Sequence, residues 1–415
     1  MMWTNVILGE RCSKIGSGAT PRGGESVYQD EGVALIRSQN VYNGLFTADG
    51  LAFIGDEHAD ELAGVTVEAG DVLLNITGDS VARCAQVPDS ILPARVNQHV
   101  AIIRPKPADF DARFLLYFFI SPQMQSYMLS LAGSGGTRNA LTKEMIQRFE
   151  IPKPRLATQR RIAEVLTAYD ELMENNRRRM ALLEEGARQL YAEWFVRLRF
   201  PGHGKRMKDE GGRMKEDALP KGWTRRRIGD IADCVGGGTP STSIPAYWDD
   251  GDITWVTPTD ITRNKHFVLL DSEKKITEAG LKYSSAKLVP PHAVLMTSRA
   301  SVGFFGITGR EVCTNQGFIS IVPHAAALTP FLLFHLSSRV EEIRAMGSGS
   351  TYPEVSRGKF REFPIVVPPR EIVSAFADYT SQLINQIRTL KRQTQKLRAA
   401  RDLLLPRLMS GEIAV

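Results

Sequence analysis

QRRIAEVLTAYDELMENNRRRMALLEEGARQLYAEWFVRLR, residues 159–199, is the stretch that decides the fold. Most of its apolar residues recur at steps of three and four, namely Ile162, Val165, Tyr169, Leu172, Leu183, Ala187, Leu190 and Trp194. This spacing makes one apolar stripe along a helix that packs against another helix. The rest of its surface is mainly Arg, Glu and Gln. We therefore expect a rod about 60 Å long, at about 1.5 Å per residue, with no catalytic groups on it.

A second stretch of this kind ends the chain. From Glu371 to Leu408 the stripe comprises Phe376, Tyr379, Leu383, Ile387, Leu390, Leu397, Leu404 and Leu408, with Thr394 and Arg401 at its two remaining positions. Two exposed apolar stripes need partners, and the simplest solution is that the two helices pack on each other in antiparallel fashion. The alternative is that each helix packs on its own globular region.

The remainder of the chain is an internal duplication, and repeats of this length decide the architecture of a chain. The matches keep their order: Gly16 to Pro21 with Gly236 to Pro240, Asn40-Val41 with Asp260-Ile261, Val72 to Leu74 with Val294 to Met296, Asn97-Gln98 with Asn315-Gln316, and Gly133 to Thr137 with Gly347 to Thr351. Chance would not preserve this order. Each long helix therefore follows one copy of the same globule.

The predicted fold class is α/β (α+β), because short extended runs broken by Gly, Pro, Asn and Asp dominate each globule. Phe110 to Leu131 and Thr329 to Met346 each predict one amphipathic helix. The predicted organisation is a globule (1–156), a long helix (157–200), a linker (201–220), a second globule (221–368), and a long helix with a tail (369–415). Antiparallel helices would then give a pseudo-two-fold dumbbell with Val415 near Met1.

The composition limits the class of protein. The chain has 415 residues, 43% hydrophobic and 24% charged, with a formal net charge of +6, which permits a polyanionic partner such as DNA. We see no apolar run long enough for a membrane span and no signal peptide, so we expect a cytoplasmic protein. The cysteines are scattered and predict reduced, packed thiols: Cys12, Cys84, Cys234 and Cys313.

Motifs for catalysis are missing from the sequence. There is no Walker A sequence, no strand followed by GxGxxG, no Asn-Pro-Pro-aromatic motif of amino-methyltransferases, and no HExxH or paired His/Cys spacing. His99, beside Asn97-Gln98, is the one histidine near a candidate loop, and we interpret it as a packing residue. Two copies of a globule without a catalytic constellation indicate two binding modules.

The loops of both copies carry residue types that contact bases and phosphates, since Arg pairs with guanine and Asn or Gln with adenine. A surface turn is the alternative interpretation for each. The candidates for DNA binding are Thr20, Arg22, Arg37, Gln39, Asn40, Asn75, Thr77, Arg83, Asn97, Gln98, Ser134, Thr137, Arg138, Thr239, Ser241, Thr259, Arg263, Ser298, Arg299, Asn315, Gln316, Ser348, Ser350 and Thr351.

The second long helix has a basic run without acids, comprising Arg388, Lys391, Arg392, Lys396, Arg398 and Arg401. A solvated face is the simple interpretation, and phosphates or acidic partner helices are the others. The first helix balances its arginines with several glutamates. Its stripe is interrupted at or near Asn176, Arg179 and Gly186, which we interpret as room for helix crossing or for docking of a partner.

These residues resemble the specificity subunit of type I restriction–modification systems. The resemblance rests on Gly237 to Ser241, Gly70 to Leu74, the two Asn-Gln pairs, Gln159 to Ala163 and Leu404 to Ile413, and it covers essentially the whole chain. The first copy departs from the pattern at Gly18 to Arg22, where Ala19 and Arg22 differ from the second copy. The two globules therefore need not make the same contacts.

The resemblance implies a subunit without catalysis or cofactor of its own. Each globule would be a target-recognition domain that reads one half of a bipartite site in double-stranded DNA. The two helices would set the spacing and bind two modification subunits, which carry S-adenosylmethionine. Restriction subunits would supply the chemistry that uses ATP and Mg²⁺. The alternatives are a coiled-coil scaffold with protein-binding heads and a self-contained methyltransferase–nuclease.

Overall fold

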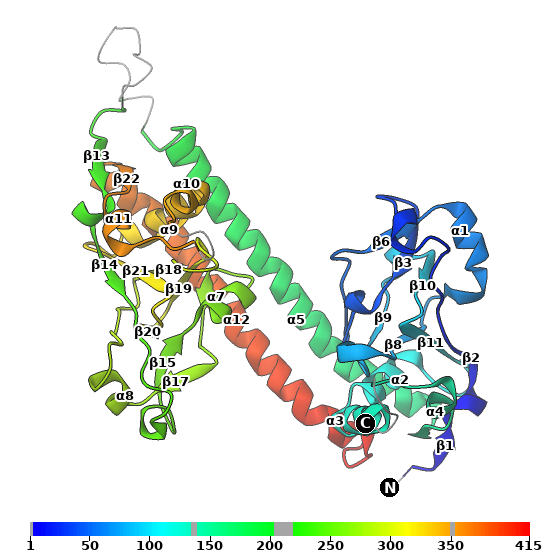
Figure 1. Ribbon diagram of the computed structural model, residues 1–415. Coiled ribbons are helices and arrows are strands. Elements are labelled where there is room, and N and C mark those ends of the chain that lie inside the picture. The colour runs from blue at the N-terminus through cyan, green and yellow to red at the C-terminus, as the bar shows by residue number, and fades with distance from the viewer. Residues whose placement is uncertain (1–2, 134–138, 203–218, 349–352) are drawn as a thin grey trace. The chain divides into compact units, whose positions relative to one another are not determined.

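The structure is a computed structural model that describes residues 3–133, 139–202, 219–348 and 353–415 (Figure 1). The chain forms two compact units. The first comprises Met1–Met173 with Lys396–Val415, and the second comprises Glu174–Gln395. Each unit thus contains one globule and a part of both long helices.

Two four-stranded sheets form the first globule. One has the order β2 (Cys12–Ser17), β11 (Val100–Pro105), β8 (Val72–Asn75), β9 (Cys84–Gln86), and the other has the order β6 (Ala52–Ile54), β3 (Val33–Ile36), β10 (Ala94–Val96), β7 (Thr66–Val67). Two further pairs are β1 (Asn5–Ile7) with β12 (Glu150–Pro152) and β4 (Val41–Tyr42) with β5 (Leu45–Phe46). The helices are α1 (Asp56–Glu61), α2 (Ala112–Phe119), α3 (Pro122–Gly133) and α4 (Lys143–Gln147).

The second globule has a five-stranded sheet of order β14 (Ala232–Gly236), β21 (Phe318–Pro323), β18 (Val294–Thr297), β19 (Phe305–Thr308), β16 (Val268–Leu269). A three-stranded sheet has the order β17 (Lys274–Ile276), β15 (Ile253–Val256), β20 (Cys313–Thr314), and β13 (Thr224–Arg227) pairs with β22 (Pro364–Val367). The helices are α7 (Pro258–Arg263), α8 (Glu278–Lys282), α9 (Leu328–Ser338), α10 (Val340–Ala345) and α11 (Arg357–Arg361).

The strand register confirms the duplication. In the first globule Val72 lies opposite Ile103, and in the second Val294 lies opposite Ile321, with antiparallel pairing in both. A parallel pair also recurs, as β3 with β10 in the first globule and as β15 with β20 in the second. The predicted fold class, two similar globules of mixed sheet and helix, is therefore correct.

The long helices are α5 (Leu156–Tyr191), which continues as a π-helical segment over Ala192–Val196, and α12 (Arg370–Met409). The start of α5 is tied to the first globule by Gln159, which is fully buried. Its amide accepts a hydrogen bond from the Asp111 N–H and donates to the carbonyls of Asp109 and Pro154. The glutamine that opens the apolar stripe is therefore a structural residue.

The two helices are antiparallel, as predicted. In the second unit Asn176 on α5 donates to the Thr394 hydroxyl of α12 at 3.4 Å, and the rings of Trp194 and Phe376 lie 5.8 Å apart. Residue numbers therefore rise along one helix where they fall along the other. In the first unit Asp170 accepts a hydrogen bond from Arg401 at 2.7 Å. Trp3 and Ile413 pack against the same core there, whereas Met1 lies outside the described residues.

Several local predictions were wrong. Each predicted helix of the globules is two helices, α2 with α3 and α9 with α10. The first helix of each pair ends early, with Ile120 and Arg339 as the C-caps. Leu172 and Tyr379, assigned to the apolar stripes, are 51% and 58% exposed. Of the three interruptions, Asn176 is buried between the helices, whereas Arg179 and Gly186 lie on the surface.

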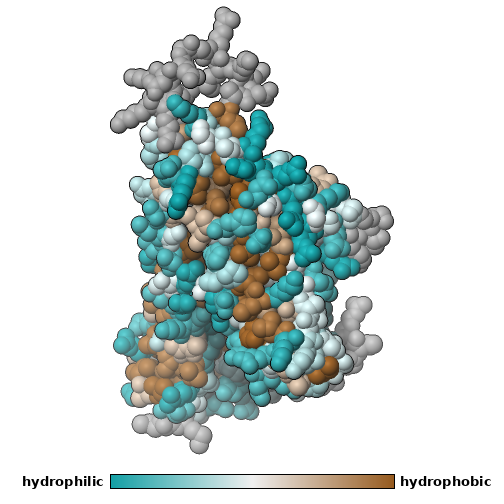
Figure 2. All heavy atoms as spheres, turned by 90° about the vertical axis from the view of Figure 1, so that its left-hand side faces the viewer, coloured by the Kyte–Doolittle hydropathy of each residue, from teal (hydrophilic) through white to brown (hydrophobic). Residues whose placement is uncertain are grey.

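The surface is mixed and the described cysteines are free. Hydrophobic patches interrupt a hydrophilic surface on the face drawn in Figure 2. None of the described helices is long and apolar enough to cross a membrane. Cys12, Cys84 and Cys313 are buried, Cys234 is half-buried, and burial raises the pKa of the Cys313 thiol to about 11. The prediction of packed, unpaired thiols is therefore confirmed.

His335 on α9 is a buried titratable group between the second globule and α5. Its Nε2 lies 3.3 Å from Nη1 of Arg339, and its Nδ1 lies 2.8 Å from the Tyr191 hydroxyl. A guanidinium can only donate, so Nε2 accepts and Nδ1–H donates to Tyr191. Burial first, and then Arg339, lowers the pKa of His335 to about 4. The neutral imidazole is therefore the form that fits this site.

We expect the second unit to lose stability as the pH falls from about 6.5 toward 4. The unfolded chain takes up the proton first, because its histidine has the higher pKa, so the stabilisation is complete above pH 6.5 and lost on acidification, up to about 3 kcal/mol. Urea unfolding of the full chain between pH 4 and 7.5 measures this. His335→Gln should remove that part of the pH dependence; an unchanged profile would contradict the assignment.

Candidate nucleic-acid interface

A chain of polar side chains lies on the surface of the first globule. The Thr20 hydroxyl, just after β2, donates to Oε1 of Gln98 at 2.6 Å. Gln98 and His99 occupy the turn between β10 and β11, and Nδ1 of His99 lies 2.7 Å from the hydroxyl of Thr77, which follows β8. Three loops that are distant in sequence thus meet. His99 is exposed, so its interpretation as a packing residue was wrong.

The second globule repeats the central pair. Thr239, after β14, donates to Oε1 of Gln316, which lies in the turn between β20 and β21. Gly317 stands where the first globule has His99, and Arg299 stands where it has Thr77. Arg299 is exposed and lies 3.8 Å from Glu354. A hollow of about 360 Å³ is bounded by Arg299, Gln316 and their neighbours.

The backbone around both pairs is the same. The Asn97 side chain accepts the His99 N–H at 3.1 Å, and the Asn315 side chain accepts the Gly317 N–H at 2.9 Å. The Asn97 N–H donates to the carbonyl of Ile36, the last residue of β3, and the Asn315 N–H donates to that of Val256, the last residue of β15. Both distances are 3.0 Å. The asparagines hold the turn, and the glutamine beside each one is left exposed.

A glycine before each threonine permits the contact. A Cβ added at Gly18 would lie 2.0 Å from the Val96 carbonyl oxygen, and one added at Gly237 would lie 2.0 Å from that of Asn315. A Cβ and a carbonyl oxygen clash at this distance, so the backbone of one of the two loops would have to move. These glycines therefore allow the Thr-Pro loop to approach the glutamine turn.

We expect Gly18→Ala to separate Thr20 from Gln98, because the loop must move away from Val96. The matched control is Gly16→Ala, two residues earlier, where an added Cβ meets nothing within 4 Å. Overpacking of this kind costs about 1–3 kcal/mol. DNA binding and thermal unfolding of the two variants measure the difference. Equal behaviour would show that the close approach is unimportant.

The chemistry of the shared pair suits base recognition. In both pairs the threonine hydroxyl fixes the orientation of the glutamine amide oxygen, and both glutamine side chains are exposed. Nε2 of Gln98 also lies 3.4 Å from Nε2 of His99. Glutamine amides pair with adenine, and an arginine such as Arg299 pairs with guanine. The shared glutamine and the different neighbours are what two readers of different short sequences require.

Other candidate residues have structural roles. Asn40 and Asn75 are fully buried, and their amides donate to the carbonyls of Thr47 and Ser38. Asn40 also accepts the Arg37 N–H at 3.0 Å, as Asp260 accepts the Thr257 N–H at 2.8 Å in the second globule. These two asparagines cap turns of the fold and do not reach the surface. The buried candidates are Asn40, Asn75, Asn97 and Ser298.

The remaining described candidates lie apart from the two pairs or are engaged elsewhere. Arg37 donates to the Gly50 carbonyl, as does Gln39, and Arg83 lies over the ring of Tyr42 at 5.0 Å. The surface candidates that the structure does not join to the pairs are Arg22, Ser241, Thr259, Arg263 and Ser348. Ser134, Thr137, Arg138, Ser350 and Thr351 lie outside the described residues.

The sequence reasoning missed His99 as a surface group and Tyr42 altogether. Tyr42 is 43% exposed on the β4–β5 hairpin, next to Arg83. The Asn43-Gly44 dipeptide between two apolar pairs was a hairpin signal. In the described part of the chain, no group of three His, Cys, Asp or Glu side chains is arranged to hold a metal ion.

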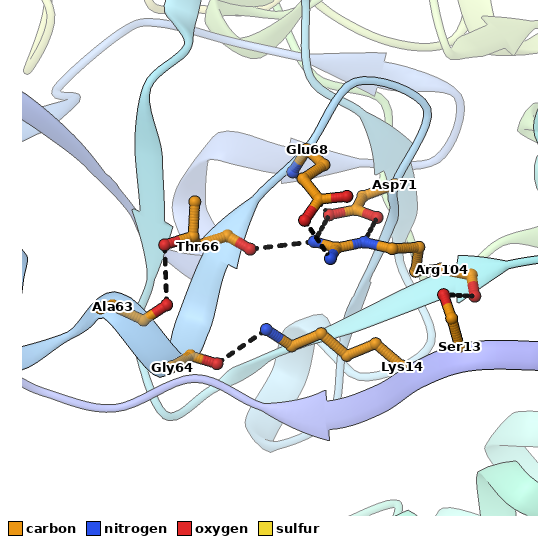
Figure 3. A network of polar contacts seen from close by, with 8 residues as sticks. All are labelled: Ser13, Lys14, Ala63, Gly64, Thr66, Glu68, Asp71 and Arg104. Carbon is orange, nitrogen blue, oxygen red and sulfur yellow. Dashed lines mark hydrogen bonds and ion pairs between the residues drawn. The ribbon is translucent and has the colours of Figure 1, made fainter.

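An ion-pair network supports the first globule beneath its sheets (Figure 3). The Arg104 guanidinium on β11 donates two hydrogen bonds to Asp71, both at 2.8 Å, and a third to the Thr66 carbonyl at 3.0 Å. Glu68 also contacts it. The hydrogen bonds to Asp71 raise the pKa of Arg104. The second globule has Val322 and Ala293 at the corresponding positions, both in an apolar cluster.

Two copies of one globule, each with an exposed threonine–glutamine pair, give the chain two similar candidate binding surfaces. The family model of the type I restriction modification DNA specificity domain matches residues 3–185 and 220–399, so the chain belongs to this family.

Relatives of known type agree with this assignment. The MjaIX type I restriction enzyme specificity subunit of Methanocaldococcus jannaschii is 34% identical over 181 residues, which are 43% of this chain and 42% of that protein. The HindI specificity subunit of Haemophilus influenzae is 23% identical over 92% of this chain and 94% of its own length. The crystal structure of a type I restriction–modification S subunit from M. genitalium has the same fold, with a TM-score of 0.62 and 16% identity over 98% of this chain and 96% of its own.

Proposed function

We propose that this chain is the DNA-specificity subunit of a type I restriction–modification complex, in which each globule reads one half of a bipartite site. The observation that carries the proposal is the exposed Thr20–Gln98 pair and its repeat, Thr239–Gln316, in the same place of the second globule. The chain contributes recognition and leaves the chemistry to its partners.

The half-site of the first globule is read by Gln98 with His99 and Thr77. The amide N–H₂ of Gln98 donates to a base edge, and the hydroxyl and imidazole beside it offer both donors and acceptors. Elsewhere on the same globule, Arg83 over the ring of Tyr42 offers a further cation and an aromatic face. Such a set favours an adenine contact flanked by less discriminating contacts.

The half-site of the second globule is read by Gln316 with Arg299. The guanidinium of Arg299 is exposed and close to a hollow large enough for a base edge. Its partner Glu354 is also exposed, so the ion pair is weak and yields readily to a nucleic acid. A guanine in this half-site is therefore favoured.

The long helices supply the spacing and the docking surface. Leu182 on α5 is 72% exposed and Leu403 on α12 is 71% exposed, and such apolar side chains on helices suit a protein partner. The partners would be two modification subunits, which hold S-adenosylmethionine, and restriction subunits, which use ATP and Mg²⁺. The complex would act in the cytoplasm on double-stranded DNA.

The test substitutes one glutamine at a time in the complex with modification subunits. We expect Gln98→Ala to relax one half-site only and Gln316→Ala to relax the other, each by about 1–3 kcal/mol of discrimination, or roughly 10- to 100-fold. Binding to duplexes that vary one half-site at a time measures this. Gln189→Ala, an exposed glutamine of α5 that donates to Glu185, is the matched control. Loss of binding to all sequences alike would contradict the proposal.

A further inference from the structure

A cluster of cations on α12 faces the second globule without carboxylate partners of its own. Arg388, Lys391 and Arg392 occupy one turn of the helix. A cavity of about 360 Å³ lies against Arg388 and Arg392, and Arg310 of the globule lines its other side. A neighbouring cavity of about 250 Å³ is lined by Lys391. Arg263 also lines the second cavity, so five cationic side chains lie around these two adjacent cavities of the unit.

The hydrogen bonds of these cations go to neutral groups. Nη1 of Arg388 donates to Asn385 at 2.7 Å, and its Nε is buried without a hydrogen-bond partner. Nζ of Lys391 donates to the Asn264 side chain and to the Val268 carbonyl. Arg388, Lys391 and Arg392 make no ion pair with any carboxylate among the described residues. Arg388 and Lys391 are half-buried and Arg392 is exposed. Cations that are even partly withdrawn from water are normally paired, so a counter-ion is missing for the first two.

The three carboxylates nearby are already engaged. Asp260, which lines the second cavity, accepts the N–H groups of Thr257 at 2.8 Å and of Glu273 at 2.9 Å. Asp271 lines the cavity, but it accepts from the Ser272 N–H at 3.0 Å and pairs with Arg310 at 3.4 Å and with Lys275 at 3.6 Å. Glu184 on α5 accepts the Phe267 N–H at 2.7 Å and lies 3.5 Å from Nδ1 of His266.

The electrostatics agree with a missing counter-ion. Burial lowers the pKa of Lys391 to about 8, and Glu184 opposes that shift only in part. Burial, followed by the charge of Arg392, also lowers the pKa of Arg388.

The duplication shows what this site lacks. When the helices are aligned by their stripes, with Ile162 on Phe376 and Trp194 on Leu408, Glu174 corresponds to Arg388. In the first helix Glu174 pairs with both following arginines, Arg177 at 2.6 Å and Arg178 at 2.8 Å. Their counterparts in the second helix are Lys391 and Arg392. The acid that neutralises this turn in α5 is thus replaced by a third cation in α12.

The globule is shaped to accept that cation. A Cβ added at Gly309 would lie 2.7 Å from Nε of Arg388, so the glycine lets the guanidinium lie flat against the loop after β19. Nε and Nη2 of Arg310 donate to the Leu270 carbonyl, so Nη2 of Arg388, Nη1 of Arg310 and the exposed Arg392 are left for a ligand. Planar guanidinium groups match the oxygen geometry of phosphate, whereas the confined volume excludes a broad protein surface.

We propose that this cavity, between α12 and the loop after β19, binds a phosphate group between Arg388, Arg392 and Arg310. The phosphate comes either from the DNA backbone or from a free nucleotide or inorganic phosphate. Backbone contacts position a protein on DNA without reading sequence, which would complement the base-reading pairs. Only the DNA source rests on the proposed function; the phosphate site itself does not.

The first experiment titrates inorganic phosphate into the full chain at constant ionic strength and follows thermal unfolding. We expect a saturable rise of about 2–4 °C at ten times the dissociation constant for the unaltered chain. The double variant Arg388→Gln/Arg392→Gln should lose it. The control Arg225→Gln/Arg226→Gln, which removes two exposed arginines of β13 in the same unit, should keep it.

The same variants separate a ligand site from a structural one. Because the arginines are uncompensated, the double variant should unfold in chloride at the same temperature as the unaltered chain or above it. A lower temperature would mean that these arginines hold the fold, and an equal response to phosphate in all three proteins would mean a general salt effect. Stabilisation by polyglutamate but not by phosphate would assign the site to a protein carboxylate. Each of these three results would overturn the proposal.

The second experiment identifies the source of the phosphate. The complex with modification subunits is titrated with non-specific duplex DNA. In the double variant, the slope of log K against log salt should fall in magnitude by about 1–2. The preference for each half-site should stay unchanged. A phosphate response without a change of slope would assign the site to a free phosphate ligand. Failure of half-site reading with an intact phosphate response would count against the proposed function alone.

Discussion

Replacing Asp71 with alanine is expected to destabilise the first unit by about 3–5 kcal/mol, because it leaves the Arg104 guanidinium buried without its main partner. The Asp71 side chain is fully buried, and that of Arg104 is 20% exposed. Asp71 also accepts the Glu68 N–H at 2.7 Å, so alanine removes a turn contact as well. Urea unfolding combined with hydrogen exchange of the β8 and β11 amides measures the loss within this unit.

The second globule supplies the rescue. It folds with Ala293 and Val322 where the first has Asp71 and Arg104. Replacing a buried ion pair by well-packed apolar groups is often neutral or stabilising, so Asp71→Ala with Arg104→Val should recover most of the stability. Glu68→Ala, at a side chain 61% exposed, should change it by about 1 kcal/mol or less. A double variant as unstable as the single one would show that the network does more than pair charges.

Replacing Phe376 with alanine is expected to destabilise the second unit by about 3–5 kcal/mol. Phe376 is fully buried near the start of α12, and its ring lies 4.9 Å from that of Phe195 and 5.8 Å from that of Trp194 on the α5 side. The Phe334 ring of α9 is 6.3 Å away. One side chain thus joins both long helices to the globule, and its loss leaves a cavity among aromatic rings.

Tyr379 is the matched control, three residues further along α12. Its ring also touches Trp194, at 6.0 Å, but the side chain is 58% exposed. Tyr379→Ala should therefore cost only about 1 kcal/mol. Hydrogen exchange of the second unit, compared between the two variants, measures the difference. If both variants exchange alike, the helices do not pack through this aromatic cluster.

The helices were predictable to within a few residues because burial follows the period of the helix. The stripe residues Ile162, Ala187 and Trp194 are indeed buried. The π-helical turn of Ala192–Val196 was not predictable from the apolar spacing; within it, the ring of Phe195 lies 5.0 Å from that of Phe331. The spacing of apolar residues also does not show which of them remain exposed, since Leu172 has the right spacing and is half exposed.

The site was predictable in residue type but not in assembly. Thr20 and Gln98 were candidates separately, yet their contact joins loops 78 residues apart. Asn40 and Asn75 show the reverse difficulty, because an amide satisfies a backbone carbonyl as well as a base, and only burial decides between them. The repeat was the most informative signal, since it predicted the same frame in both globules while leaving their individual contacts free to differ.

The central proposal is that each globule reads one half of a split DNA sequence. Its most direct test is methylation mapping of a methylation-free host genome that expresses this chain with its modification subunits. We predict one methylated motif of two short half-sites separated by a gap of fixed length and any sequence. Gln98→Ala should degrade one half-site and leave the other half-site and the gap intact. A continuous motif, or a variant that alters both half-sites together, would contradict the proposal.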